Sequence, residues 1–249
     1  MSISETQVLR PGRELAGQTV LVIGGSGGIG LETARLAREL GADVIVTARN
    51  EDRLRSVRDE LGARVSAFDA TDPERLERFF EELPSPIDHV LLTGPGPYYA
   101  PLAEFDFDKA AADVGAHLFL PLRVARAAVG KVRAGGTLLF MGGTGGRRTA
   151  PGLALISALT AAGRALTRNL AREIAPIRVN MIAPGFVDTP LSAALLGDQL
   201  DARREQLRTT LAIRRVVGPA DIAALAVHLM ANTAITGATF DIDGGEQLV

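Results

Sequence analysis

A glycine-rich segment is the first feature of the sequence that could do chemistry. It follows an apolar run at 19–23 and precedes a helical pattern. Glycine lets a pyrophosphate come close to the backbone, and the N-terminus of the following helix offers its N–H groups to the phosphates. A plain turn is the alternative. We expect a dinucleotide site whose residues here are Gly24, Ser26, Gly27, Gly28, Ile29 and Gly30.

The end of the second apolar run, at 43–47, indicates which dinucleotide binds. NAD sites usually place a carboxylate there, where it bonds the ribose hydroxyl. Here the residues are Ala48, Arg49 and Asn50. A guanidinium can pair with the 2′-phosphate of NADP, which a carboxylate would repel. We therefore expect NADPH as the cofactor, held at this end by Arg49 and Asn50, unless Arg49 simply begins the next loop.

The composition excludes several other kinds of chemistry. The chain has no cysteine, and its three histidines lack metal-ligand spacing, so no metal site is expected. With 27 basic and 29 acidic residues the net charge is −2, which does not favour nucleic-acid binding. The longest uncharged stretch, 222–240, is too polar to span a membrane, and the N-terminus lacks the apolar run of a signal peptide. We expect a cytoplasmic protein.

Short apolar runs alternate with amphipathic stretches along the chain. The predicted strands are 19–23, 43–47, 64–68, 89–92, 137–141, 177–182 and 239–242. The predicted helices are 28–40, 51–61, 73–83, 107–129, 152–174 and 220–230. This alternation predicts an α/β fold, a doubly wound parallel sheet with helices on both faces, in a single domain over 1–249. Residues 1–13 are expected to form a loose arm, and the Arg-rich stretch 190–217 a substrate lid.

Several motifs together resemble the short-chain dehydrogenase/reductase superfamily, from about residue 14 to the end of the chain. The spacing of Gly24, Gly28 and Gly30 resembles that family's glycine loop. The segment FDATD places Asp69, followed by Ala70, where the family's acid bonds the adenine amino group. The segment APGFVDTP resembles its nicotinamide-side segment, which here supplies Pro184, Gly185, Val187 and Thr189. The tail TGATFDIDGGEQLV resembles its closing strand and Asp-Gly-Gly turn.

This resemblance implies a seven-stranded Rossmann sheet and an NADP-dependent oxidoreductase. It also implies a homodimer or homotetramer built through the two long helices at 107–129 and 152–174. After the fourth strand the family has Asn-Asn-Ala-Gly, whereas this chain has Leu92-Thr93-Gly94-Pro95. Thr93 and Gly94 are expected to line the cofactor at this point.

The resemblance breaks at the catalytic set. The family uses Ser, Tyr and Lys with a supporting Asn, and its Tyr and Lys stand four residues apart on one helix face. The only tyrosines are adjacent, and no lysine follows either of them at that spacing. When the chain is matched to the family, the positions of Asn, Ser, Tyr and Lys are occupied, in that order, by Gly115, Gly143, Ile156 and Thr160. A positioned general acid contributes about 10²–10⁴-fold, so its loss removes the usual route to hydride transfer without forbidding the reaction.

Substitutes for the missing groups remain open. Tyr98 or Tyr99, after the fourth strand, could protonate a substrate or could simply form an aromatic wall of the pocket. Thr144 could replace the serine, and Thr160 could bond the nicotinamide ribose or only fill the helix. His117 lies two residues beyond the asparagine position and is expected about 200° around the helix, away from the site.

Three classes of function follow from these residues. The first is an oxidoreductase that transfers a hydride from NADPH to an unknown small-molecule carbonyl or activated alkene. The second is a non-catalytic NADP(H)-binding sensor or assembly protein, and the third is a non-redox lyase or isomerase that uses the same pocket. The arginines of the lid could hold an anionic substrate, although a solvated charged face also explains them.

Overall fold

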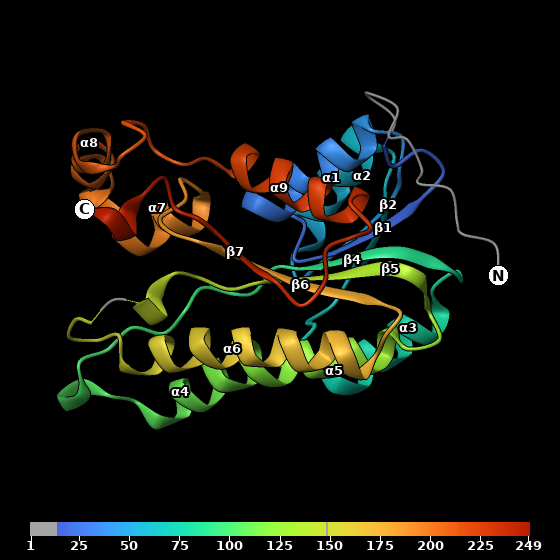
Figure 1. Ribbon diagram of the computed structural model, residues 1–249, viewed down its shortest axis with the longest axis horizontal. Coiled ribbons are helices and arrows are strands. Elements are labelled where there is room, and N and C mark those ends of the chain that lie inside the picture. Colours follow the sequence, from blue (N-terminus) through green and yellow to red (C-terminus); the bar gives the residue numbers. More distant parts are fainter. Residues whose placement is uncertain (1–13, 148) are drawn as a thin grey trace.

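The computed structural model describes residues 14–147 and 149–249 (Figure 1). The predicted arm at 1–13 lies outside the described residues. In the described part, seven parallel strands form one sheet in the order β3-β2-β1-β4-β5-β6-β7. The strands are β1 Thr19–Ile23, β2 Asp43–Ala48, β3 Arg64–Ala67, β4 Ile87–Leu92, β5 Val132–Met141, β6 Arg178–Pro184 and β7 Thr239–Ile242. The strand order reverses between β1 and β4, where open sheets of this type bind ligands beyond the carboxyl ends of their strands.

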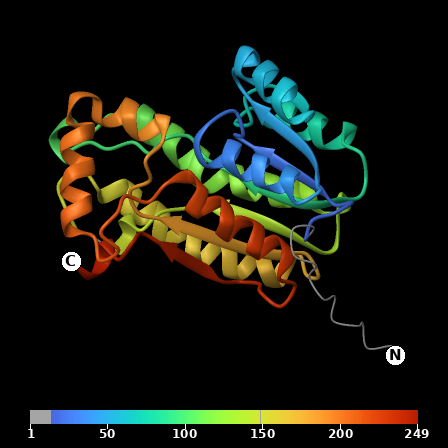
Figure 2. The same cartoon turned by 90° about the horizontal axis from the view of Figure 1, so that it is seen from above.

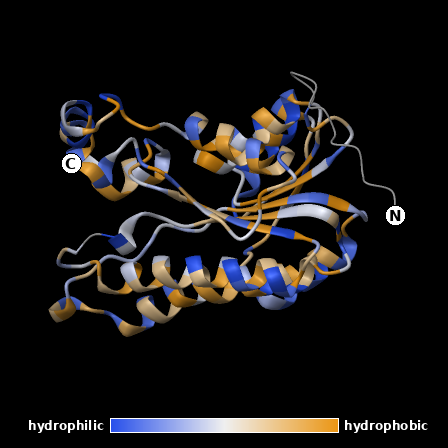
Figure 3. Cartoon of the chain, viewed as in Figure 1, coloured by the Kyte–Doolittle hydropathy of each residue, from blue (hydrophilic) through white to orange (hydrophobic). Residues whose placement is uncertain are grey.

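Helices cover both faces of the sheet, which confirms the predicted doubly wound fold (Figure 1). One face carries α1 Gly28–Glu39, α2 Glu51–Leu61 and α9 Pro219–Ala231. The other carries α3 Pro73–Glu82, α4 Phe107–Val114, α5 Leu120–Ala128 and α6 Ala154–Glu173. The buried side chains form one apolar cluster on each face, and the central strands are correspondingly hydrophobic (Figure 3). No helix in the described ranges is long and apolar enough to cross a membrane.

Side-chain caps set where several helices begin. The Asn50 Oδ1 atom accepts from the Arg53 backbone N–H at 2.8 Å and starts α2. Asp72 accepts from two N–H groups of the first turn of α3, and Asp106 does the same for α4. Such caps satisfy backbone donors that have no partner within the helix. The first turn of α1 differs, because Gly27 at its N-cap has no side chain to offer.

The predicted helix 107–129 is divided in the structure. A five-residue π-helical segment, Gly115–Phe119, separates α4 from α5. Pro121 lies two residues after this segment. It has no N–H to bond the carbonyl of His117, four residues earlier, so one bond of the regular helical ladder is missing there.

The predicted lid at 190–217 contains two helices that the sequence analysis did not predict. They are α7 Pro190–Leu196 and α8 Leu200–Thr210, and they lie beyond the carboxyl ends of the strands (Figure 2). Thr189 caps α7, because its Oγ1 accepts from the Ser192 N–H at 3.2 Å, and Pro190 occupies the first turn. The Thr-Pro pair is thus an ordinary helix-start signal.

The helices α4, α5 and α6 leave apolar side chains in solvent, and these predict self-association. Phe107 is 76% exposed and Phe119 is 50% exposed, while Ala158 and Ala161 are exposed on α6. A second copy across a two-fold axis would cover such a face. Light scattering at micromolar concentration should therefore give at least twice the chain mass of 26.2 kDa. Phe119→Asp should lower that mass and Phe119→Leu should not; a wild-type mass near one chain contradicts the prediction.

Candidate active site

The glycine loop is shaped by contacts that only glycine permits. The N–H groups of Gly24 and Gly25 both donate to the Thr47 carbonyl, at 2.8 and 3.1 Å. Gly24 and Gly28 have positive φ values of 89° and 54°, which other residues rarely adopt. A Cβ atom on Gly30 would lie 2.6 Å from the Gly24 carbonyl oxygen. The predicted loop is therefore a tight turn packed against the first turn of its own helix.

The N-terminus of α1 is open for an anion. Gly27 provides no side-chain cap, and the first turn contains no acidic residue. Ser26 and Ile29 flank this turn and are partly exposed. Thr189, the N-cap of α7, lies next to this turn, because a Cβ on Gly28 would lie 3.5 Å from the Thr189 Cβ atom. Unpaired N–H groups and the helix dipole at such a turn suit a phosphate, so this cradle fits the pyrophosphate of a dinucleotide.

Thr93 joins the fourth strand to the glycine loop. Its hydroxyl lies 3.0 Å from both the Ile23 and the Gly24 carbonyl oxygens. Its backbone N–H donates to Ile23 as well, at 2.9 Å. Gly94, the next residue, is exposed at the same edge. The two predicted residues of this segment thus border the cradle.

A second group of predicted residues gathers at the ends of β2 and β3. Arg49 is exposed and makes no ion pair with the described residues. The Asp69 carboxylate accepts from the N–H and the hydroxyl of Thr71, at 2.9 and 2.8 Å. Burial alone would raise the pKa of Asp69. The two bonds from Thr71 and the nearby charge of Arg49 outweigh burial and hold that pKa below its usual value. Asn50 is used as the α2 cap, and Ala70 packs against the core.

The segment after β6 lies between the cradle and the C-terminal residues. The Pro184 carbonyl accepts from the Thr144 N–H at 3.0 Å, which joins the ends of β5 and β6. The Gly185 N–H donates to Ile242 at 3.3 Å. Val187 is buried and pairs with Val217 in a parallel bridge. With Thr189 beside Gly28, this segment borders the glycine loop.

The positions matched to the catalytic Ser, Tyr and Lys converge, although their side chains cannot act in the usual way. A Cβ on Gly143 would lie 3.7 Å from the Thr160 Cγ2 atom. Ile156 is buried and has no polar atom. The Thr160 hydroxyl lies 3.0 Å from the Ile156 and Ser157 carbonyl oxygens of its own helix. Gly115, at the asparagine position, faces open space.

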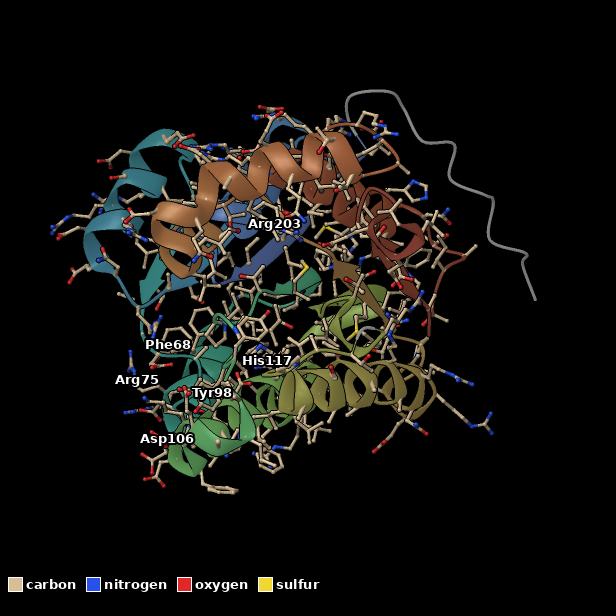
Figure 4. The ribbon with its side chains drawn as sticks, turned by 90° about the vertical axis from the view of Figure 1, so that its left-hand side faces the viewer. Phe68, Arg75, Tyr98, Asp106, His117 and Arg203 are labelled. Carbon is tan, nitrogen blue, oxygen red and sulfur yellow. The ribbon has the colours of Figure 1, made fainter. Side chains whose placement is uncertain are left out.

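The candidate substitutes have different surroundings. The Asp106 N–H donates to the Tyr98 hydroxyl at 2.9 Å, so this phenol is engaged at the start of α4 (Figure 4). Tyr99 is 51% exposed, and burial of its phenol followed by the charge of Asp113 raises its pKa above the usual value. Thr144 is buried. These three residues are not brought to one point.

The expectation for His117 is wrong. A Cβ on Gly94 would lie 3.7 Å from its Nε2 atom, so the ring reaches the edge that carries the predicted cofactor residues. Helical side chains lean toward the N-terminus and cover the preceding turn, and this ring contacts Asp113 one turn earlier. The angular spacing of Cα atoms alone misplaces such a long side chain. The signal available in the sequence was the four-residue spacing of Asp113 and His117.

The arginines of the lid are engaged within the protein. Ion pairs connect Arg203 with Glu246, Arg204 with Asp188, Arg208 with Glu205, and Arg215 with Asp221. Arg214 donates to the Thr209 carbonyl. Bonds to Asp188 and Asp201 raise the pKa of Arg204 above its usual value. These contacts favour the interpretation that the arginines form a charged structural surface rather than a binding site for an anionic substrate.

A pocket of about 500 Å³ lies between the loop after β4 and the loop before α6. Thr149 and Ser157 are its polar side chains, and its apolar residues include Ala100, Pro101, Leu102, Phe105, Pro151 and Leu153. Gly146 also lines it, and a Cβ there would lie 2.7 Å from the Thr160 hydroxyl. The pocket therefore adjoins the positions matched to the catalytic set.

Known proteins share this architecture. A family model described as Enoyl-(Acyl carrier protein) reductase matches residues 24–247. The curated protein "Short-chain dehydrogenase/reductase ATR9" of Stachybotrys chlorohalonatus is 29% identical over 250 residues, which cover 93% of this chain and 97% of that protein. The chain belongs to the short-chain dehydrogenase/reductase superfamily of oxidoreductases.

Solved structures agree with this assignment. The MalC reductase/Diels-Alderase of Malbranchea aurantiaca is similar to this chain with a TM-score of 0.86 and 25% identity, over 96% of this chain and 100% of that one. BdcA in complex with NADPH is similar with a TM-score of 0.84 and 26% identity, over 93% and 95% of the two chains.

The crowding at Gly30 predicts a clear effect of substitution. Gly30→Ala forces a Cβ to within 2.6 Å of the Gly24 carbonyl oxygen, and overpacking of this kind costs roughly 1–3 kcal/mol. The melting temperature without nucleotide should fall by several degrees. Gly27→Ala is the matched control, because its Cβ would meet no atom within 4 Å and its φ of −178° is ordinary extended backbone. Equal melting temperatures for both variants contradict this reading of the loop.

Proposed function

We propose that the protein is an NADPH-dependent reductase that acts on a small, largely apolar carbonyl compound or activated alkene. The observation that carries this proposal is the uncapped N-terminus of α1, which opens between Thr93 and Thr189 at the carboxyl edge of the sheet. Bound NADPH would supply a hydride at this edge. The apolar pocket beside Thr160 supports the substrate class.

The cofactor is proposed to lie along the predicted residues. The glycine loop would hold the pyrophosphate, Asp69 the adenine, and the segment from Pro184 to Thr189 the nicotinamide. Arg49 would pair with the 2′-phosphate, because it is exposed and lies near Asp69 without forming an ion pair with it. The NADPH complex of BdcA, a structural relative, supports the same preference.

We propose that reduction proceeds without the usual Ser-Tyr-Lys set. Neither Gly143 nor Ile156 has a side-chain polar atom, and the Thr160 hydroxyl is bonded within its helix. Acceptors whose reduced forms are stable anions depend least on proton donation. Activated ketones, enones and quinones are therefore the preferred substrates of this site.

Turnover of such acceptors tests the proposed function directly. The loss of NADPH absorbance should be followed with trifluoroacetophenone, cyclohexenone and menadione, and the products identified by mass spectrometry. We expect wild type to reduce at least one of them. A protein that binds NADPH but oxidises it with none of these would instead be a non-catalytic NADP(H)-binding protein.

Substitution of Arg49 tests the cofactor preference. Arg49→Ala removes the proposed partner of the 2′-phosphate and should weaken NADPH binding by roughly 1.5–3 kcal/mol, the value of a charge-assisted hydrogen bond. NADH binding should hardly change, because NADH lacks that phosphate. Calorimetric titration measures both, with Arg53→Ala as a control for loss of an exposed positive charge on α2. An equal loss for the two nucleotides contradicts the proposal.

A further inference from the structure

A histidine and a carboxylate form a pair at the carboxyl edge, next to the position of the missing asparagine. The His117 Nδ1 atom lies 2.9 Å from the Asp113 Oδ1 atom and 3.1 Å from the Asp113 carbonyl oxygen. Both oxygens are hydrogen-bond acceptors, so Nδ1 carries the ring proton. The Nε2 atom is therefore the end of the ring that can exchange a proton.

The free nitrogen lies beside the predicted cofactor residues. The Nε2 and Cδ2 atoms of His117 would lie 3.7 and 3.9 Å from a Cβ on Gly94, a residue that is itself exposed. Thr93, next to Gly94, bonds the glycine loop. The His117 side chain is 17% exposed, so ligand and water can reach it. Figure 4 shows His117 on the side of α4–α6 that faces the sheet.

A packing role does not explain the carboxylate of this pair. The Asp113 side chain is 4% exposed, and its Oδ2 atom has no hydrogen-bond partner among the described residues. Burial of a carboxylate is costly unless the charge is compensated. A carboxylate behind Nδ1 fixes the tautomer of an imidazole and stabilises its protonated form. Burial of the Tyr99 phenol is the main cause that raises its pKa, and the nearby charge of Asp113 raises it further. The phenol therefore stays neutral.

We propose that His117 is the proton donor of this reductase and that Asp113 is its positioning residue. The proposal rests on the proposed function, since it supplies the proton that a reduction needs. Reduction of a ketone adds a hydride, which bound NADPH supplies, to the carbonyl carbon and a proton to the oxygen. The proton leaves Nε2 of the His117 imidazolium for that oxygen, and the electron pair of the broken N–H bond stays on Nε2. The neutral ring then takes up a proton from water at the exposed edge.

Nuclear magnetic resonance of the histidine rings tests the placement without any turnover. The chain has only three histidines; burial lowers the pKa of His89 to about 3, and His228 is exposed on α9. NADP⁺ should shift the carbon-bound ring protons of His117, whereas 2′-phospho-ADP-ribose, which lacks nicotinamide, should leave them unchanged. Nitrogen-15 spectra should show the proton of neutral His117 on Nδ1, and Asp113→Asn should reduce that tautomer. Binding of NADP⁺ without any shift of His117 overturns the placement.

Kinetics test the chemical role. With trifluoroacetophenone, His117→Gln should lower kcat by about 10²-fold, the lower end of the usual contribution of a general acid, because this activated ketone depends less on proton donation than an ordinary one. The Kd of NADPH should stay unchanged. Asp113→Asn should lower kcat without changing that Kd. His228→Gln is the matched control, and melting temperatures report whether each variant folds. Wild-type turnover by a folded His117→Gln overturns His117 as proton donor but leaves the proposed function standing. A wild type that reduces none of the three acceptors overturns the proposed function itself.

Discussion

The Thr93 hydroxyl, which bonds the carbonyl oxygens of Ile23 and Gly24, is the interaction on which the carboxyl edge depends. It joins the end of β4 to the end of β1 where the strand order reverses, and open sheets of this type bind their ligands at such a point. A Cβ on Gly24 would lie only 2.2 Å from that hydroxyl oxygen. Any larger residue at position 24 would therefore collide with the Thr93 side chain. The Thr93 bond to Gly24 holds the glycine loop against the end of β4, next to His117.

The predicted lid at 190–217 shows a second constraint, because charge pairs connect two neighbouring arginines of α8 to other parts of the protein. Arg204 bonds Asp188 through two nitrogens, and Arg203 bonds Glu246 near the C-terminus. Both pairs are partly buried. Fully exposed pairs contribute only about 0–1 kcal/mol each, so the main effect of these two is to hold α8 against Asp188 and Glu246. The pocket of the candidate site is lined mainly by apolar residues, and neither of these arginines is among them.

The sequence predicts the sheet and most helices well because those elements bury regular apolar patterns. β6 is buried at every residue, and the predicted start of the helix at residue 73 coincides with the observed start of α3. The helix α8 escaped prediction because its polar composition hides its period. The helix α7 escaped because it has only seven residues and its start depends on a local signal, the cap at Thr189. The direction of the His117 ring was also missed, because it depends on a side-chain contact made within a π-helical segment, and only the four-residue spacing from Asp113 indicates that contact in the sequence.

The two halves of the candidate site place different demands on the chain. The cofactor cradle is made of backbone groups and close approaches, so it exists wherever the strand, glycine loop and helix pack as they do here. Proton transfer needs only one titratable side chain within reach of the same edge. At the usual catalytic positions, Ile156 is an apolar residue buried in the protein, and the Thr160 hydroxyl is hydrogen-bonded within its own helix. Neither residue leaves a buried polar group without a partner, so neither destabilises the fold. The donor can therefore sit on a different helix, as we propose for His117, without any change to the cradle.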